Sequence, residues 1–155
     1  MKLVDRVVHI DADVEDVYAL LTDTERFVTW MAPTATLDPT PGGVVTWTHL
    51  NGDVMSGSFV EVVPNRRIVF TFGWERADVG VPPGSTTVEI SLRAIDGGTE
   101  LHLIHRGLPG PMADAHAGGW TNYLERLAVV ASGRDPGPDP LAAERVPAAR
   151  TLGIA

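Results

Sequence analysis

The sequence PMADAHAGGWTNYLERLAVVASG, residues 111–133, predicts one long helix with a single apolar face. Its proline suits the first position of a helix, where the backbone N–H has no intrahelical partner anyway. Apolar and aromatic residues then recur at steps of three or four: Met112, His116, Trp120, Tyr123, Leu127 and Val130. Gly133 is a stop signal. A helix of this kind needs a partner surface, which the preceding segments are expected to supply.

The segments before the helix are predicted to be strands, because they are rich in β-branched residues and bounded by turn signals. They are residues 3–10, 34–38, 44–50, 53–63, 66–74, 86–95 and 99–106. Asn51-Gly52 predicts a type I′ hairpin turn. Two short helices, at 14–22 and from Thr24 to about residue 30, follow the first strand. An antiparallel sheet with helices packed on one face is an α+β architecture.

Alternation along the strands indicates which side chains face the helix, because successive strand residues point to opposite faces. In the segment 68–74 the inward positions are the bulky ones: Ile68, Phe70, Phe72 and Trp74. In the last strand Leu101, Leu103 and His105 share the inner face, and His102 points outward. One histidine is therefore predicted to lie on an otherwise apolar face.

Composition excludes several functional classes. Among 155 residues there are 12 Lys and Arg against 20 Asp and Glu, a net charge of −8. This balance argues against nucleic acid and against an anionic membrane surface. There is no cysteine, and no apolar run approaches the roughly 18 residues of a membrane span. The first six residues already carry charge and form no signal-peptide core, so we expect a cytoplasmic protein.

Metal and cofactor sites are not expected. His102 and His105 are separated by an odd number of positions and so face opposite sides of their strand. The chain contains no His-Glu-x-x-His pair, no phosphate-binding glycine loop and no Gly-x-Ser-x-Gly elbow. These patterns predict neither a metal site nor a bound cofactor, and they disfavour a hydrolase or a nucleotide-cleaving enzyme.

The chain divides once, near residue 132. Residues 1–132 have the periodicity of one domain, whereas the following Gly-Arg-Asp-Pro-Gly-Pro-Asp-Pro, residues 133–140, has three prolines in five positions. Such a segment cannot continue a helix or a strand. Residues 133–155 are therefore predicted to be a Pro-rich linker and a C-terminal tail, either packed on the domain or partly disordered.

The order of these motifs resembles a known group of proteins. It is similar to the activator-of-Hsp90-ATPase-homologue-1-like, or polyketide-cyclase-like, family of the START/Bet v 1-like (SRPBCC, helix-grip) superfamily. The segments that carry the resemblance are residues 10–13, 17–21, Trp30, Gly57, 59–68, Trp74, 98–101, 105–108, 116–120, 123–124 and Leu127. The resemblance implies a curved antiparallel sheet of six to seven strands that grips the C-terminal helix, with a cavity between them.

The residues expected to line that cavity are aromatic side chains and two histidines on the predicted inner faces. They are Trp30, Trp47, Phe70, Phe72, Trp74, His105, His116, Trp120 and Tyr123. Indole, phenol and imidazole offer flat contact and one polar tip, as pocket walls often do. Each is equally consistent with an ordinary packed core. The adjacent Gly118-Gly119 costs about 1 kcal/mol per residue in a helix, which a close approach to the sheet or to a ligand would explain, as would a local kink.

Three functions are consistent with these observations. The first is a binding protein, without catalytic activity, for a small apolar or aromatic molecule. The second is a polyketide-cyclase-like enzyme in which His105 or His116 transfers a proton. The third, which the family resemblance implies, is a module that stimulates the ATPase of an Hsp90-type chaperone. Such domains also make a homodimer plausible.

Overall fold

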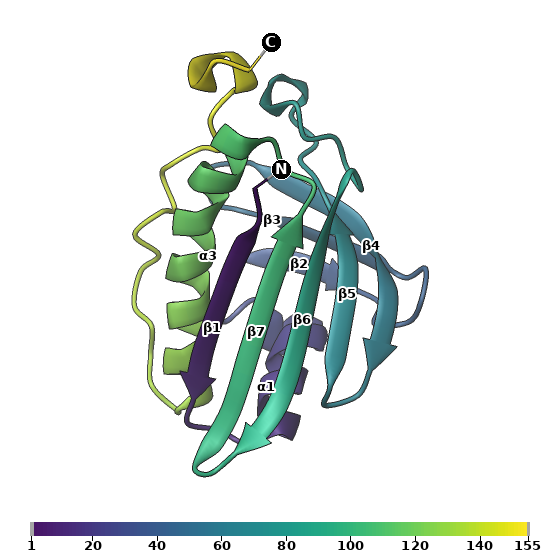
Figure 1. Cartoon of the computed structure of the whole chain (residues 1–155). Coiled ribbons are helices and arrows are strands. Elements are labelled where there is room, and N and C mark those ends of the chain that lie inside the picture. Colours follow the sequence, from purple (N-terminus) through teal and green to yellow (C-terminus); the bar gives the residue numbers. More distant parts are fainter. Residues whose placement is uncertain (1, 155) are drawn as a thin grey trace.

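The computed structural model describes residues 2–154 and consists of a curved antiparallel sheet with one long helix against its concave face (Figure 1). The seven strands lie in the order β1-β7-β6-β5-β4-β3-β2. Their bounds are β1 Val4–Ile10, β2 Thr34–Leu37, β3 Val44–Thr48, β4 Val54–Val63, β5 Arg67–Phe72, β6 Thr86–Ile95 and β7 Gly98–Arg106. The predicted α+β helix-grip fold class is confirmed.

The helices are α1 Val14–Thr22, α2 Thr24–Phe27 and α3 Gly110–Ala131, with the 3₁₀ turns η1 Ala77–Val79 and η2 Ala149–Leu152. The predicted apolar face of α3 is buried at Met112, His116, Trp120, Tyr123 and Leu127. No helix within residues 2–154 has the length and apolarity that crossing a bilayer requires.

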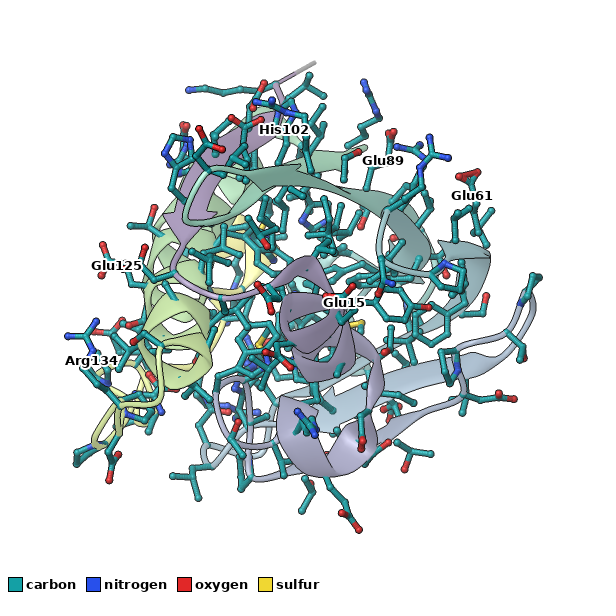
Figure 2. All side chains as sticks on the ribbon, turned by 90° about the horizontal axis from the view of Figure 1, so that it is seen from below. Glu15, Glu61, Glu89, His102, Glu125 and Arg134 are labelled. Atoms are coloured by element: carbon teal, nitrogen blue, oxygen red, sulfur yellow. The ribbon has the colours of Figure 1, made fainter. Side chains whose placement is uncertain are left out.

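The two faces of the sheet differ as the alternation predicts. The inward residues of β5 and β7 are buried, including Phe72 and His105. The outer face carries charged pairs instead. Arg67 contacts Glu61 at 2.8 Å and Glu89 at 3.0 Å, and Figure 2 shows both glutamates, with His102, on the outer side of the sheet. The concave face is therefore the one on which a site can form.

The connection between β3 and β4 differs from the predicted type I′ turn. That turn needs positive φ at both central residues, and only Gly52 has it, with φ +91°. Asn51 is used otherwise: its side-chain oxygen accepts from the Asp53 N–H at 2.8 Å, and its Nδ2 donates to the Glu144 carbonyl at 2.6 Å. This loop is thereby attached to the C-terminal segment.

The C-terminal segment, residues 133–154, runs back beside α3 and reaches η1 (Figure 1, yellow). Gly133 makes the reversal possible because its φ of +86° is unfavourable for other residues. Arg126 of α3 then donates to the Gly137 carbonyl at 3.0 Å. Further contacts at Asp139, Glu144 and Val146 attach the tail to the domain, so that it forms part of the surface around the end of the sheet.

Candidate functional site

The principal pocket lies where α3, the β3 and β5 ends of the sheet and the C-terminal tail meet. Its volume is about 330 Å³. Three groups of residues line it. The first comes from the sheet and its loops: Met31, Trp47, His49, Asn51, Phe72 and Trp74. The second comes from α3: Ala115, His116, Gly118, Gly119, Trp120, Asn122 and Tyr123. The third comes from the tail: Leu141, Glu144, Arg145, Val146 and Pro147.

Six of the nine residues expected at the cavity lie on this pocket: Trp47, Phe72, Trp74, His116, Trp120 and Tyr123. The other three lie elsewhere. Trp30 and Phe70 border a separate hollow of about 20 Å³, and the Trp30 Nε1–H donates to the Leu20 carbonyl at 2.8 Å. His105 is fully buried and lines neither space. Strand alternation identified the correct face for Phe70 and His105 but not their distance from the pocket.

His105 has both ring nitrogens occupied. The Trp120 indole N–H donates to Nδ1 at 3.1 Å, which leaves the ring proton on Nε2. Nε2 then donates to the Thr86 hydroxyl at 2.8 Å, whose own proton goes to the Phe72 carbonyl at 2.8 Å. Burial, with nearby His116, lowers the pKa of His105 to about 3. His105 is therefore neutral near pH 7 and has no free nitrogen to offer a substrate.

His116 is enclosed in the same way. The Trp74 indole N–H donates to Nε2 at 2.9 Å, and Nδ1–H donates to the Met112 carbonyl at 2.7 Å. Burial lowers the pKa of His116, although the hydrogen bond to Met112 partly opposes that shift. We call these two histidines the sealed layer, because both ring nitrogens of each are occupied and each imidazole accepts one indole N–H, although the His116 ring also borders the pocket.

His49 is a functional candidate that the sequence analysis missed. It lines the pocket and is only half-buried. The Trp47 indole N–H donates to its Nε2 at 3.1 Å, and its Nδ1 lies 3.5 Å from the Tyr123 hydroxyl. The sequence contained a clue to this position. His49 lies two residues after Trp47, which was predicted to point inward, and residues two apart on a strand point to the same face.

Tyr123 connects His49 to the tail. Its hydroxyl donates to Asp139 Oδ2 at 2.6 Å, while Asn122 Nδ2 and the Leu141 N–H donate to Oδ1 at 3.1 and 2.8 Å. Burial raises the pKa of Tyr123, and the Asp139 carboxylate raises it further. Burial alone would raise the pKa of Asp139, but these donors hold it below its ordinary value. Asp139 is therefore ionised near pH 7.

A buried carboxylate, Asp53, fixes the other end of the tail wall. Its side chain is 1% exposed and accepts from Arg76 and Arg145, each at 2.8 Å. The Val146 N–H donates to the second oxygen, also at 2.8 Å. Burial by itself would raise the pKa of Asp53, but these three donors lower it below its ordinary value. No pattern in the sequence indicates that the tail packs against Asp53.

The two adjacent glycines of α3 border the pocket rather than the sheet. A Cβ atom built on Gly118 or Gly119 finds nothing within 4 Å. Close approach of the helix to the sheet, one of the explanations considered for this pair, is therefore not seen. Their missing side chains leave open space beside α3. Within residues 2–154, no three His, Cys, Asp or Glu side chains form a group that could hold a metal ion.

A curved sheet that grips a long C-terminal helix, with a pocket between them, defines a helix-grip domain. Residues 11–132 match the model of the family described as activator of Hsp90 ATPase homolog 1-like protein, and the chain belongs to that family. The resemblance noted from its motifs is confirmed.

Known relatives share different amounts of the chain. The human activator of 90 kDa heat shock protein ATPase homolog 1 is 28% identical over 110 residues, which are 70% of this chain and 30% of that protein. The chain thus spans about a third of the length of this relative. An AHSA1-like protein of Rhizobium etli, solved by NMR, is 44% identical with a TM-score of 0.69, covering 94% of this chain and 91% of the other.

Two further solved structures share the fold. DynU16, from the dynemicin biosynthetic locus, has a TM-score of 0.76 at 24% identity, covering 90% of this chain and 51% of the other. Aha1 from Colwellia psychrerythraea, described as a dimer, has a TM-score of 0.71 at 17% identity, covering 84% of this chain and 96% of the other. At these identities the likeness shows the fold alone.

Proposed function

We propose that the protein binds a small apolar or aromatic molecule in the pocket between α3 and the sheet. The observation that carries this proposal is the volume of about 330 Å³, lined by three indole rings, Trp47, Trp74 and Trp120, and left open at Gly118 and Gly119. A concave, mostly apolar space with a few polar groups is typical of ligand pockets. Burial of apolar ligand surface at about 25 cal/mol per Å², less the cost of association, supplies the affinity.

A titration with 2-ethylnaphthalene, followed by tryptophan fluorescence and calorimetry, tests the proposal. The wild-type protein is expected to bind the probe at one site. Gly119→Leu fills the space beside α3 and is expected to abolish binding. The matched control is Glu125→Leu, which places the same leucine side chain, in exchange for an exposed glutamate, on the outer side of the same helix (Figure 2). Equal affinity in the two variants would show that the probe binds elsewhere.

The polyketide-cyclase-like alternative gains no support from the histidines first considered for it. A general base needs an unoccupied nitrogen within reach of its substrate. His105 and His116 each have a hydrogen-bond partner on both ring nitrogens, at 2.7 to 3.1 Å. Their role in this proposal is to fix the orientation of Trp74 and Trp120 in the pocket wall.

A second candidate function is interaction with an Hsp90-type chaperone. It is favoured by the family match over residues 11–132 and by the name of the human relative. The direct measurement is the ATPase rate of the chaperone from the same organism, with and without this protein. Stimulation is the expected result, and an unchanged rate at saturating protein would remove this candidate. A homodimer, a cytoplasmic location and a separate tail after residue 132 stay predictions.

A further inference from the structure

We propose that His49 gives the pocket its chemical preference, selecting neutral aromatic ligands that carry a carbonyl oxygen, to which its Nδ1–H donates. The inference rests on the proposed function, because it concerns the same pocket. It goes further by naming the ligand class and the residue that recognises it. Four observations support it: the position of the ring proton, the length of its present hydrogen bond, the charge around the pocket and the aromatic rings around His49.

The ring proton of His49 is on Nδ1. An indole N–H can only donate, so the contact from Trp47 Nε1 at 3.1 Å requires a lone pair on His49 Nε2. A neutral imidazole with a lone pair on Nε2 carries its proton on Nδ1. Burial lowers the pKa of His49, while Asp139 and Asp53 oppose that shift, so the ring is neutral near pH 7. His49 therefore offers the pocket a donor, not a base.

That donor has a poor partner in the structure. The Tyr123 hydroxyl has one proton, which goes to Asp139 at 2.6 Å, so Tyr123 can only accept from His49. The distance from Nδ1 to the Tyr123 oxygen is 3.5 Å, beyond the 2.7–3.2 Å of a good N–H···O bond. The corresponding N–H donors of His105 and His116 have partners at 2.8 and 2.7 Å. Among these three histidines, His49 is therefore the one whose hydrogen bonding a ligand oxygen can improve.

The charges around the pocket favour a neutral acceptor over an anion. Glu144 lines the pocket, and the ionised Asp139 lies behind Tyr123. The cation that also lines it, Arg145, is paired with Asp53 at 2.8 Å. A ligand carboxylate would face two carboxylates and compete with a third for its cation. A ketone or aldehyde oxygen accepts a hydrogen bond without that repulsion.

The rings around His49 favour a flat ligand. The imidazole lies 5.4 Å from the Tyr123 ring and 6.0 Å from the Trp74 ring, tilted by 36° and 37°. Aromatic faces at these separations pack against one another in offset geometry. A carbonyl conjugated to an aromatic ring places its oxygen in the ring plane, so one planar ligand can pack on these faces and reach Nδ1.

The test compares 2-acetylnaphthalene with 2-ethylnaphthalene, which has the same carbon skeleton without the oxygen. The wild-type protein is expected to bind the ketone about tenfold more tightly, equivalent to about 1.4 kcal/mol for one net hydrogen bond. His49→Phe keeps a ring but removes the donor, so the two affinities are expected to become equal, mainly through loss of ketone binding. Tyr123→Phe removes the competing acceptor and is expected to keep or increase the preference.

The outcomes separate this inference from the proposed function. Equal binding of both probes by the wild-type protein would overturn the role of His49 and leave the pocket proposal standing. Binding of neither probe would end both. Tightest binding of 2-naphthoate would overturn the inference in favour of an anion held by Arg145. Should His49→Phe fail to fold, as judged by circular dichroism, the wild-type preference and its response to Tyr123→Phe decide the question.

Discussion

Two regions of this protein use the same tryptophan–histidine hydrogen bond for different ends. In the sealed layer, between α3 and the β5–β7 side of the sheet, Trp120 donates to His105 and Trp74 to His116. In the open corner, between β3, α3 and the tail, Trp47 donates to His49. The sealed histidines have a short second bond, and His49 has a long one. The difference teaches that residue type alone does not identify a candidate binding histidine. What distinguishes His49 is the weak hydrogen bond of its second ring nitrogen and its access to the pocket.

The largest predicted difference between the regions is in stability. His105→Ala removes a fully buried ring and leaves the Trp120 indole N–H without an acceptor. The expected loss in free energy of unfolding is about 3–4 kcal/mol, because a cavity and an unsatisfied donor are created together. His49→Ala, at the half-buried corner, is expected to cost about 1 kcal/mol. Urea unfolding measures the stability of both variants. Equal losses would contradict the distinction between the sealed layer and the open corner.

Acid pH is expected to act on the sealed layer next. The pKa of His105, about 3 in the folded protein, is below the unfolded value of about 6.5. The unfolded state therefore binds more protons below pH 6.5, and stability is lost as pH falls from 6.5 towards 3. Each histidine that stays neutral in the folded protein is expected to lower the free energy of unfolding by about 1.4 kcal/mol between pH 7.5 and 5.5.

Chemical denaturation at a series of pH values measures this loss. The variant His105→Gln removes one of the titrating groups, so its stability is expected to fall less steeply with acid than that of the wild-type protein. Parallel pH curves for the two proteins would contradict a neutral, buried His105.

The tail wall of the open corner is expected to lose its structure independently of the sealed layer. Asp53→Asn removes the charge that holds Arg76, Arg145 and the Val146 N–H. Because both guanidinium groups reach solvent, the expected loss is about 2 kcal/mol, less than for a fully buried pair. Hydrogen exchange is expected to speed up around residues 139–147 while β6 and β7 stay protected. Uniform loss of protection would show that the tail is integral to the core.

The smallest predicted effect tests the open space beside α3 directly, and it is a gain in stability rather than a loss. Gly119→Ala is expected to stabilise the protein by about 0.5–1 kcal/mol, because alanine is the better helix former and its Cβ meets nothing within 4 Å. A thermal melt measures the gain. Destabilisation would mean that the space beside α3 is needed by the protein's own packing.

The sequence predicted the fold well because its signals are local. The apolar stripe of α3 and the alternation in β5 and β7 each depend on neighbouring residues, and their buried faces are as expected. The pocket depends on contacts across the chain instead. Asp53 meets Arg145 across 92 positions, and no periodicity encodes such a pair. Strand alternation could place Phe70 and His105 on the inner face but could not show that they lie away from the pocket.

The most direct measurement is a histidine side-chain ¹H–¹⁵N NMR spectrum recorded during titration with 2-acetylnaphthalene. We expect the Nδ1 signal of His49 to move in proportion to bound ligand. The ring ¹⁵N chemical shifts of His105 and His116 are expected to stay at the neutral-ring values that they have in the ligand-free protein. Movement of the sealed histidines with His49 unchanged, or no movement at saturating ligand, would contradict a binding site in the open corner.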